Sequence, residues 1–319
     1  MIGELRPASE VGDDRPAPLL ITGPTASGKS ELAARVGEVV INADSQQVYA
    51  DWQILTARPE PEEVAQRPHK LYGHVGLDET YSVGRWVREV AAALAEAQAA
   101  GRRVVIVGGT GLYFKALTVG LVDLPETPRE LRALAEAELE RLGLAGFAAA
   151  LAERDPQTLA QIDRSNPMRL LRAFEVLEMT GDGLAAWQQR TAPPLLPLAK
   201  TVPIALMPPR DWLYARCEAR FDRMIARGAL DEVRAVMALG PPPEAPGLKA
   251  VGAPELMAHL RGETDLETAI AAGKTATRRY AKRQLTWIRN QMSAWRKIPV
   301  PLDPSALAGL VNGLTQNSP

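Results

Sequence analysis

Residues 19–30, LLITGPTASGKS, constrain the fold of this chain more than any other segment. A short apolar run, which predicts a buried strand, leads into Gly23-x-x-x-x-Gly28-Lys29-Ser30, and residues 31–36 then show helical apolar spacing. Strand, glycine-rich loop and helix together form a P-loop, in which backbone N–H groups and the lysine bind phosphate and the serine hydroxyl binds Mg²⁺. The loop residues predicted to bind a di- or triphosphate are Gly23, Pro24, Thr25, Ala26, Ser27, Gly28, Lys29 and Ser30.

Composition indicates a soluble globular protein. The 319 residues are 46% hydrophobic without a long uncharged apolar run, so we expect no membrane span, and one α/β domain plus a smaller domain. Residues 1–17 are polar and contain proline, which predicts a flexible extension and not a signal peptide. The single cysteine, Cys217, excludes a disulfide framework and a cysteine-built metal site, and we expect a cytoplasmic monomer.

The distribution of charge matters more than its sum. A net charge of −1 argues against general binding of polyanions, but residues 268–302 contain no Asp or Glu. Such a block predicts a local positive face of the kind that binds a phosphate backbone. The basic residues in the block are Lys274, Arg278, Arg279, Lys282, Arg283, Arg289, Arg296 and Lys297.

A long helix is expected from about Asp265. Its packing stripe steps by four and three through Ala281, Leu285, Ile288, Met292 and Trp295. Lys282, Arg289 and Arg296 step by seven along an adjacent face, which leaves a basic row for an anionic partner. Residues 303–319 are predicted to be a frayed tail.

Two further strands are expected to end beside the P-loop. Residues 39–42 lead into Asp44, and residues 104–107 lead into the glycine-rich turn that holds Thr110. Ligands of a doubly wound sheet bind beyond the carboxyl ends of its strands, so both side chains should lie at the edge that holds the P-loop. Asp44 is a candidate base or metal-associated carboxylate, and as an alternative or additional role it could cap residues 45–49.

Residues 125–192 change to a helical, Ala- and Leu-rich character, with Asn166 as the expected N-cap and Pro167 as the first helical residue. We interpret this region as an all-helical insertion, after which residues 201–207 return to the sheet as a strand. The predicted organisation is an extension (1–17), the first part of a P-loop core (18–124), the insertion (125–197), the second part of the core with the basic helix (198–302) and the tail (303–319).

The strand at residues 201–207 is followed by a predicted helix that carries Arg216 and Arg220. The two side chains are four residues apart, so they share one face. Solvated surface arginines are the default interpretation, and contact with an anion is the alternative. His69 and His74 lie in a loop-like region without metal-ligand spacing, so we expect them to be structural or substrate-lining.

Short motifs are spread over residues 18–296 in the order GPTASGKS, INADSQQVY, TARP, PHKL, YSV, GGTGLYFKAL, NPMRLLRAFEV, LYARCEARFDRMIARGALDEV and AKRQLTWIR. Jointly they resemble those of the bacterial tRNA dimethylallyltransferases, also called tRNA isopentenyltransferases. The resemblance implies transfer of a dimethylallyl group from its diphosphate to N6 of adenosine 37, in tRNAs that read codons beginning with U. It also implies a P-loop core and a helical insertion that together embrace the anticodon stem-loop.

The resemblance also implies roles for individual residues. Asp44 would be the base near N6, Thr110 and Arg132 would assist the leaving group, and Arg216 and Arg220 could neutralise it. Ser30 would join Mg²⁺. The residues implied to line tRNA are Asp44, Ser45, Gln46, Gln47, Met168, Arg169, Leu170, Leu171, Arg172, residues 249–254 including Lys249, and residues 282–289 including Lys282, Arg283, Gln284 and Arg289.

One segment departs from the family pattern. Val251-Gly252-Ala253-Pro254 stands where the family usually has Val-Gly-Tyr-Arg, which puts that tRNA contact in doubt but not the reaction. Three other functions stay open. A small-molecule kinase would use the same loop for ATP, an adenylate isopentenyltransferase would act on the free nucleotide without needing the basic helix, and an RNA-binding P-loop protein would need neither Asp44 nor Thr110.

Overall fold

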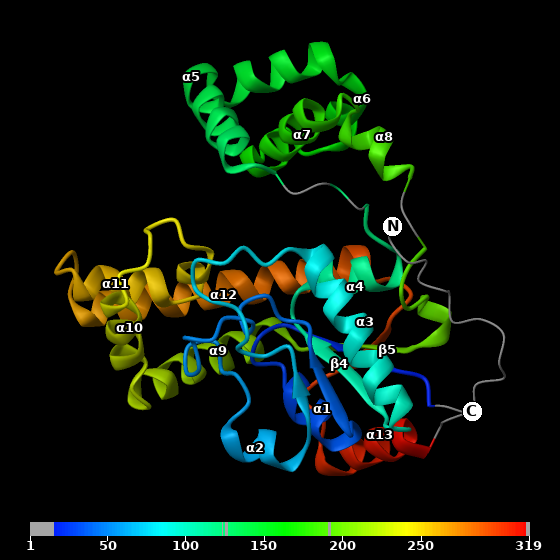
Figure 1. Cartoon of the computed structure of the whole chain (residues 1–319). Helices are drawn as coiled ribbons and strands as arrows, with labels where there is room; N and C mark the ends of the chain where they lie inside the picture. Colours follow the sequence, from blue (N-terminus) through cyan, green and yellow to red (C-terminus); the bar gives the residue numbers. More distant parts are fainter. Residues whose placement is uncertain (1–15, 123, 125–126, 191–192, 317–319) are drawn as a thin grey trace. The chain divides into compact units, whose positions relative to one another are not determined.

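The structure is a computed structural model, and it describes residues 16–122, 124, 127–190 and 193–316. It divides the chain into two compact units, shown in Figure 1. We call Met1–Thr118 with Leu195–Pro319 the P-loop unit, and Val119–Pro194 the helical unit. The expected extension over residues 1–17 lies outside the described residues, apart from Pro16 and Ala17.

The P-loop unit is built on a six-stranded parallel sheet with the order β3-β2-β4-β1-β5-β6. Its strands are β1 (Leu19–Thr22), β2 (Val39–Asn42), β3 (His69–Lys70), β4 (Val104–Gly108), β5 (Val202–Met207) and β6 (Arg296–Pro299). The four predicted strands are confirmed to within a residue at either end. The edge strands β3 and β6 were not predicted. Strand β3 has only two residues, and β6, with the sequence RKIP, is mostly exposed and shows no apolar run.

Successive residues of the central strands pack into different cores, which explains why these strands read as continuous apolar runs. Leu20 and Ile106 face a core with helices α3 (Val83–Ala99) and α4 (Gly111–Thr118). Ile21 and Val105 face the opposite core, with α1 (Lys29–Val36) and α13 (Pro304–Gln316). Figure 1 shows these two pairs of helices on opposite sides of the sheet.

The register of the sheet brings the strand ends to one edge. Thr22 pairs with Gly108 and Asn42 pairs with Val107, so the loops after β1, β2 and β4 begin side by side. Gly108 permits this approach, because a Cβ at that position would lie 2.0 Å from the backbone carbonyl of Ala43. The predicted meeting of these loops at one edge is therefore confirmed.

A second group of helices packs beside the sheet around Trp52, Phe221 and Leu256. It consists of α9 (Arg210–Ala226), α10 (Ala229–Ala238), η2 (Pro246–Lys249), α11 (Ala253–Leu260) and the N-terminal half of α12 (Leu266–Gln291). The short elements α2 (Pro61–Gln66) and η1 (Leu198–Lys200) complete the unit. Helix α12 begins as predicted, with the Asp265 carboxylate accepting the backbone N–H of Thr268.

Two predictions about the C-terminal region are wrong. Arg296 lies in β6, so it does not continue the row of Lys282 and Arg289 along α12. Residues 304–316 form α13 instead of a frayed tail. Its side chains at Leu307, Leu310, Val311 and Leu314 recur at helical spacing and pack against the core around α1, which stabilises the helix.

The helical unit consists of α5 (Arg129–Arg154), α6 (Pro156–Gln161), α7 (Pro167–Thr180) and α8 (Leu184–Gln188). Asn166 caps α7 as predicted, since its side chain accepts the backbone N–H groups of Met168 and Arg169. Gly143 interrupts α5 with a φ of 65°. The core of this unit forms around Phe147, Leu159 and Leu170.

Candidate active site

The P-loop turns between β1 and α1 with its lysine pointing inward. Gly28 adopts a φ of 90°, a conformation that favours glycine, and the backbone then enters α1. The Nζ of Lys29 donates to the carbonyl of Pro24 at 3.3 Å. Burial lowers the pKa of Lys29 to about 8, against an opposing contribution from the charge of Asp44. The site therefore holds a buried lysine whose charged form an anionic ligand would stabilise.

Gln284 of α12 links the P-loop to the glycine-rich turn. Its Oε1 accepts the backbone N–H of Thr25 at 2.8 Å, and its Nε2 donates to the carbonyl of Gly109 at 3.1 Å. The side chain is buried, at 6% exposure. Gln284 was predicted to line tRNA; in the structure its side-chain amide is engaged by two backbone groups of the core.

Asp44 is held in place by the end of β2. Its backbone N–H donates to Oδ1 of Asn42 at 2.8 Å, and Nδ2 of Asn42 donates back to the carbonyl of Asp44 at 2.9 Å. Its own Oδ1 accepts the backbone N–H of Gln46 at 3.0 Å, so the carboxylate closes a turn. Residues 45–49 form turns and a bridge, not a helix, so the alternative role of helix cap is not seen.

Thr110 joins the glycine-rich turn to the loop of Asp44. Its hydroxyl accepts the backbone N–H of Ser45 at 2.9 Å and donates to Oγ of Ser45 at 3.2 Å. A further bond runs from the Thr110 N–H to the carbonyl of Ala43. Thr110 thereby fixes the segment that carries the carboxylate.

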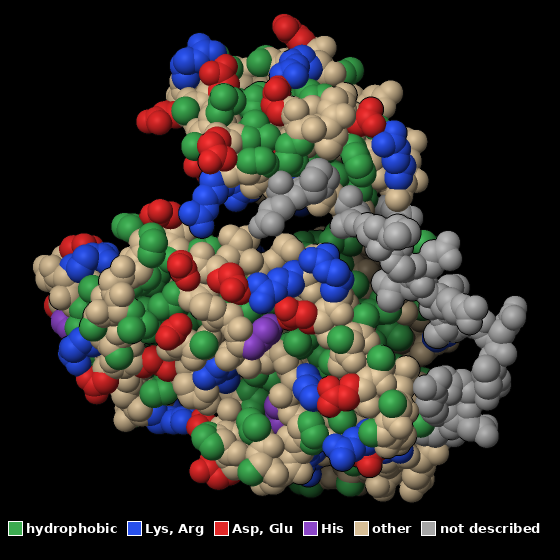
Figure 2. All heavy atoms as spheres, in the orientation of Figure 1, with side chains coloured by type: hydrophobic (Ala, Val, Ile, Leu, Met, Phe, Trp, Pro, Cys, Tyr) green, Lys and Arg blue, Asp and Glu red, His purple; other side chains and the backbone are tan. Residues whose placement is uncertain are grey.

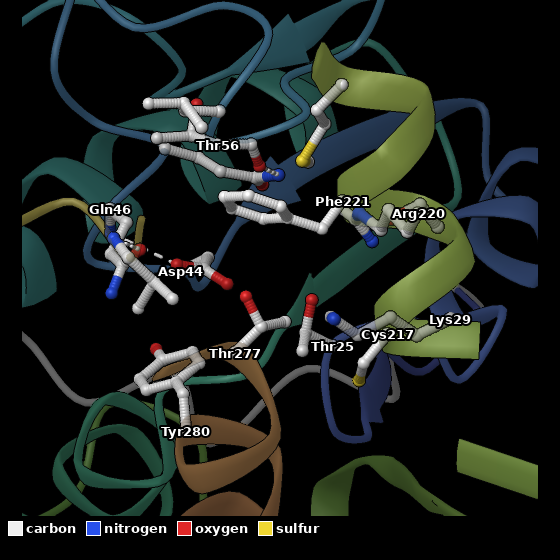
Figure 3. Close-up of a pocket in the computed structure, with 15 residues that line it drawn as sticks. Thr25, Lys29, Asp44, Gln46, Thr56, Cys217, Arg220, Phe221, Thr277 and Tyr280 are labelled. Carbon is white, nitrogen blue, oxygen red and sulfur yellow. Dashed lines mark hydrogen bonds between the residues drawn. The ribbon is translucent and has the colours of Figure 1, made fainter. Parts of the chain in front are cut away.

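One pocket brings the P-loop and Asp44 together (Figure 3). Every residue of its lining belongs to the P-loop unit. The polar lining consists of Thr25, Lys29, Ser30, Asp44, Gln46, Gln47, Thr56, Arg220, Thr277 and Tyr280, and the other lining residues are Leu55, Cys217, Phe221, Met224 and Val251. The arrangement places cationic groups and a carboxylate around the same space, with an apolar wall beside them.

The two predicted anion-binding arginines reach the site differently. Arg220 lines the pocket, and burial lowers the pKa of its guanidinium while the charge of Asp44 opposes that effect. Arg216 instead donates from Nε to the carbonyl of Ala26 at 2.9 Å, and its guanidinium lies 4.8 Å from the ring centroid of Trp212. Arg216 therefore braces the backbone of the P-loop at Ala26.

The loop that supplies Leu55 and Thr56 is fastened by an acid from α10. The carboxylate of Glu232 accepts the backbone N–H groups of Gln53, Ile54 and Leu55 at 2.6, 2.7 and 2.9 Å. Nothing in the sequence around Glu232 pointed to this role, because the partners are backbone groups about 180 residues away.

The exposed side of α12 carries the predicted basic residues. Lys282, Arg283 and Arg289 are exposed, and in the described part of the chain none of them pairs with an acid. By contrast, Lys274 and Arg278 form ion pairs with Asp222 and Glu218 of α9. Figure 2 shows basic and acidic side chains interspersed over the visible face, so positive charge is not general on that face.

Several predicted tRNA contacts lie in the helical unit. Leu170 and Leu171 are buried in its core, which excludes surface contact through these two side chains, while Met168 and Arg169 are exposed. Glu175, 1% exposed, accepts hydrogen bonds from Thr127, Arg132 and Arg172. The guanidinium of Arg132, predicted to assist the leaving group, is thus paired within its own unit.

Comparison with known proteins assigns the family. The sequence model of the family described as IPP transferase matches residues 47–291. The chain belongs to the IPP transferase family. A tRNA dimethylallyltransferase of Cereibacter sphaeroides is 56% identical over 296 residues, which cover 92% of this chain and 91% of the relative. A tRNA dimethylallyltransferase of Phenylobacterium zucineum is 50% identical over 283 residues, covering 88% and 91% of the two chains.

Solved structures agree with this IPP transferase assignment. A tRNA isopentenylpyrophosphate transferase from Bacillus halodurans matches with a TM-score of 0.65 and 31% identity, over 95% of this chain and 98% of that chain. A eukaryotic dimethylallyltransferase acting on tRNA matches with a TM-score of 0.76 and 27% identity, over 88% of this chain and 73% of that chain. The resemblance drawn from the motifs is therefore confirmed.

The pocket of this IPP transferase family member contains few side chains that could ligate a metal ion. Among the residues that the structure describes, no group of three or more His, Cys, Asp or Glu could hold a metal ion. Ser30 lies exposed at the first turn of α1 and lines the pocket with Asp44. This donor set suits Mg²⁺ that takes most of its ligands from phosphate oxygens and water. Within the described ranges, no helix combines the length and apolar character needed to span a bilayer.

Some pocket residues were not predicted from the sequence. Thr277 and Tyr280 precede Gln284 on α12 by seven and four residues, so helical spacing from the buried Gln284 could have identified them. Leu55, Phe221 and Met224 come from two separate segments, and only the fold brings them together. Val251, which also lines the pocket, lies in the segment 249–254 that the resemblance implied to line tRNA.

Proposed function

We propose that the protein transfers a dimethylallyl group from dimethylallyl diphosphate to N6 of adenosine 37, in tRNAs that read codons beginning with U. The products would be N6-dimethylallyladenosine and diphosphate. The observation that carries the proposal is one pocket that joins Lys29 and Arg220 to Asp44, in a chain 56% identical to a tRNA dimethylallyltransferase.

The nucleophile needs the carboxylate. An exocyclic adenine amine is a poor nucleophile because its lone pair is delocalised into the ring, so loss of its proton must accompany formation of the C–N bond. Asp44 is the carboxylate of the pocket, and its backbone is fixed by Asn42 and by the Ser45–Thr110 contact. We assign Asp44 as the general base, with Asn42 and Thr110 as its positioning residues.

The leaving group needs cations. As the bond from the allylic carbon to oxygen breaks, negative charge develops on the diphosphate, and Lys29, Arg220 and the P-loop N–H groups are placed to stabilise it. Ser30 would hold Mg²⁺ together with diphosphate oxygens. The ion would supply further stabilisation of the departing charge. Assistance by Arg132 stays a prediction, since its guanidinium is paired with Glu175.

The tRNA is expected to bind along α12 and to insert one base. Extrusion of the adenine from its stack costs about a few kcal/mol, which contacts elsewhere must offset. Lys282, Arg283 and Arg289 supply positive charge for the backbone. We further propose a cytoplasmic monomer, and the single buried cysteine is consistent with a reducing compartment.

Mass spectrometry of nucleosides tests this function. Unmodified tRNA incubated with the protein, Mg²⁺ and dimethylallyl diphosphate should yield N6-dimethylallyladenosine, and free AMP in place of tRNA should not. Modification of AMP alone would favour the adenylate enzyme. Transfer of phosphate from labelled ATP to a small molecule, without prenylation of tRNA, would favour a kinase.

A further inference from the structure

The candidate pocket has two chemically different sides. Figure 3 shows Lys29 and Thr25 on one side and the ring of Phe221 on another, close to Thr56. Leu55, Met224 and Val251 continue the apolar lining. With a diphosphate on Lys29 and the reacting carbon beside Asp44, the hydrocarbon end of the substrate is left to face this apolar wall.

The ring of Phe221 cannot withdraw from the pocket, because two glycines bring backbone directly against it. A Cβ on Gly273 of α12 would lie 2.3 Å from Cζ of Phe221, and a Cβ on Gly252 would lie 2.6 Å from Cε2. The residue as a whole is 1% exposed. Phe221 is therefore clamped between α12 and the turn before α11, and the space that it fills is fixed.

We propose that Phe221 is a specificity-determining residue that limits the transferred prenyl group to five carbons. This inference rests on the proposed function and adds the substrate range of the same pocket. A ten-carbon geranyl chain carries one more isoprene unit and would have to occupy the volume of the clamped ring. The close backbone at Gly252 and Gly273 prevents the ring from moving aside.

The first test replaces Phe221 and compares dimethylallyl diphosphate with geranyl diphosphate as donors to the same tRNA. Phe221→Leu should raise the ratio of kcat/KM for geranyl to that for dimethylallyl by about 10- to 100-fold, the size expected for fit in an apolar pocket. Phe221→Ala should raise it further if that variant folds. An unchanged ratio in folded Phe221→Leu, checked by circular dichroism, would overturn the proposal.

The second test moves the Phe221 ring further into the pocket instead of removing it. Gly273→Ala should force Phe221 into the pocket and raise KM for dimethylallyl diphosphate by about tenfold, with KM for tRNA unchanged. Adding Phe221→Leu to Gly273→Ala should restore KM, because the smaller side chain removes the clash. Failure of this rescue in a folded double variant would contradict the clamp.

Phe147→Leu is the matched control, since it makes the same substitution at a buried phenylalanine of the helical unit. It should lower stability without changing the donor ratio. A comparable rise in the ratio in this control would show that loosened packing, not Phe221, sets chain length. The two proposals fail separately. If the parent protein prenylates no tRNA, the proposed function is refuted. If the parent protein uses dimethylallyl diphosphate and Phe221→Leu leaves the donor ratio unchanged, only the chain-length role is refuted.

Discussion

The side chain of Gln284 holds the backbone N–H of Thr25 at 2.8 Å, so α12 is tied directly to the P-loop. The same helix presents Lys282 and Arg283, the two residues before Gln284, to solvent. A buried residue directly after two exposed cations thus supports the phosphate-binding loop. The helix expected to bind RNA is therefore bonded directly to the loop expected to bind diphosphate.

Gln284→Ala should lower the free energy of unfolding by about 2 to 4 kcal/mol, because it leaves the Thr25 N–H and the Gly109 carbonyl without their partner. Gln284→Glu keeps an acceptor for Thr25 but turns a buried carboxylate oxygen toward the Gly109 carbonyl, so it should destabilise the protein at least as much as Gln284→Ala. Urea denaturation measures both variants. Equal stability of the Ala variant and the parent protein would show that water replaces the side chain.

Asp44→Asn should lower the single-turnover rate by about two to four powers of ten, because the amide keeps the shape of the side chain but cannot accept the proton. Affinity for an anticodon stem-loop should stay nearly unchanged. Rapid quench with excess enzyme measures the rate, and filter binding measures the affinity. A near-normal rate would assign the base to another group.

Lys29 should make the use of dimethylallyl diphosphate depend on pH. Its pKa is lowered to about 8, so in the free enzyme it is charged below that pH and becomes neutral as the pH rises through it. Diphosphate binding requires the charged form, and kcat/KM for the diphosphate should therefore fall with a midpoint near this pKa. Lys29→Arg, which stays charged, should lose this alkaline limb. Its persistence in the arginine variant would assign the titration elsewhere.

Lys282 and Arg289 should account for part of the salt dependence of tRNA binding. Each phosphate neutralised by a side chain releases about 0.7 to 0.9 of a counterion. Replacing both residues with Ala should flatten the slope of log affinity against log salt concentration by roughly one to two units and raise KM for tRNA. Arg35→Ala, which removes an exposed arginine from α1, is the control. A slope equal to that of the parent would mean that tRNA approaches from another side.

Glu232→Ala should release the loop at residues 53–55. Three backbone N–H groups lose their acceptor, so we expect a loss of about 2 to 3 kcal/mol in the free energy of unfolding. KM for the diphosphate should rise as well, because Leu55 and Thr56 line the pocket. Glu244→Ala in an exposed loop is the matched control. Proteolysis and urea midpoints measure the outcome, and parent-like values would contradict the fastening role.

The sequence predicted the parts of the fold that follow local rules. The strand of the P-loop and the strands before Asp44 and Thr110 are buried on both faces, so they read as apolar runs without alternation. The helix at the C-terminus was missed because its apolar spacing lies among Pro, Gly and Asn, which favour loops.

The candidate site was predictable only along its polar side. Lys29 and Asp44 follow strand ends, and parallel strands bring such ends together. Gln284 was expected to line tRNA because the resemblance implied that role for residues 282–289, whereas helical geometry turns it with Ala281 and Ile288 toward the core. Leu55 and Phe221 line the same pocket through tertiary packing alone, and no spacing rule connects them.

The order of the sheet has a consequence for synthesis of the chain on the ribosome. Strand β1 pairs with β4, made before the helical unit, and with β5, made after it. Until residues 202–207 emerge, the strand that carries the P-loop has one unpaired edge, an aggregation-prone feature. The nascent protein must therefore carry this open edge through translation of the whole helical unit. A chain released from the ribosome before residues 202–207 are made would leave one edge of β1 without a paired strand.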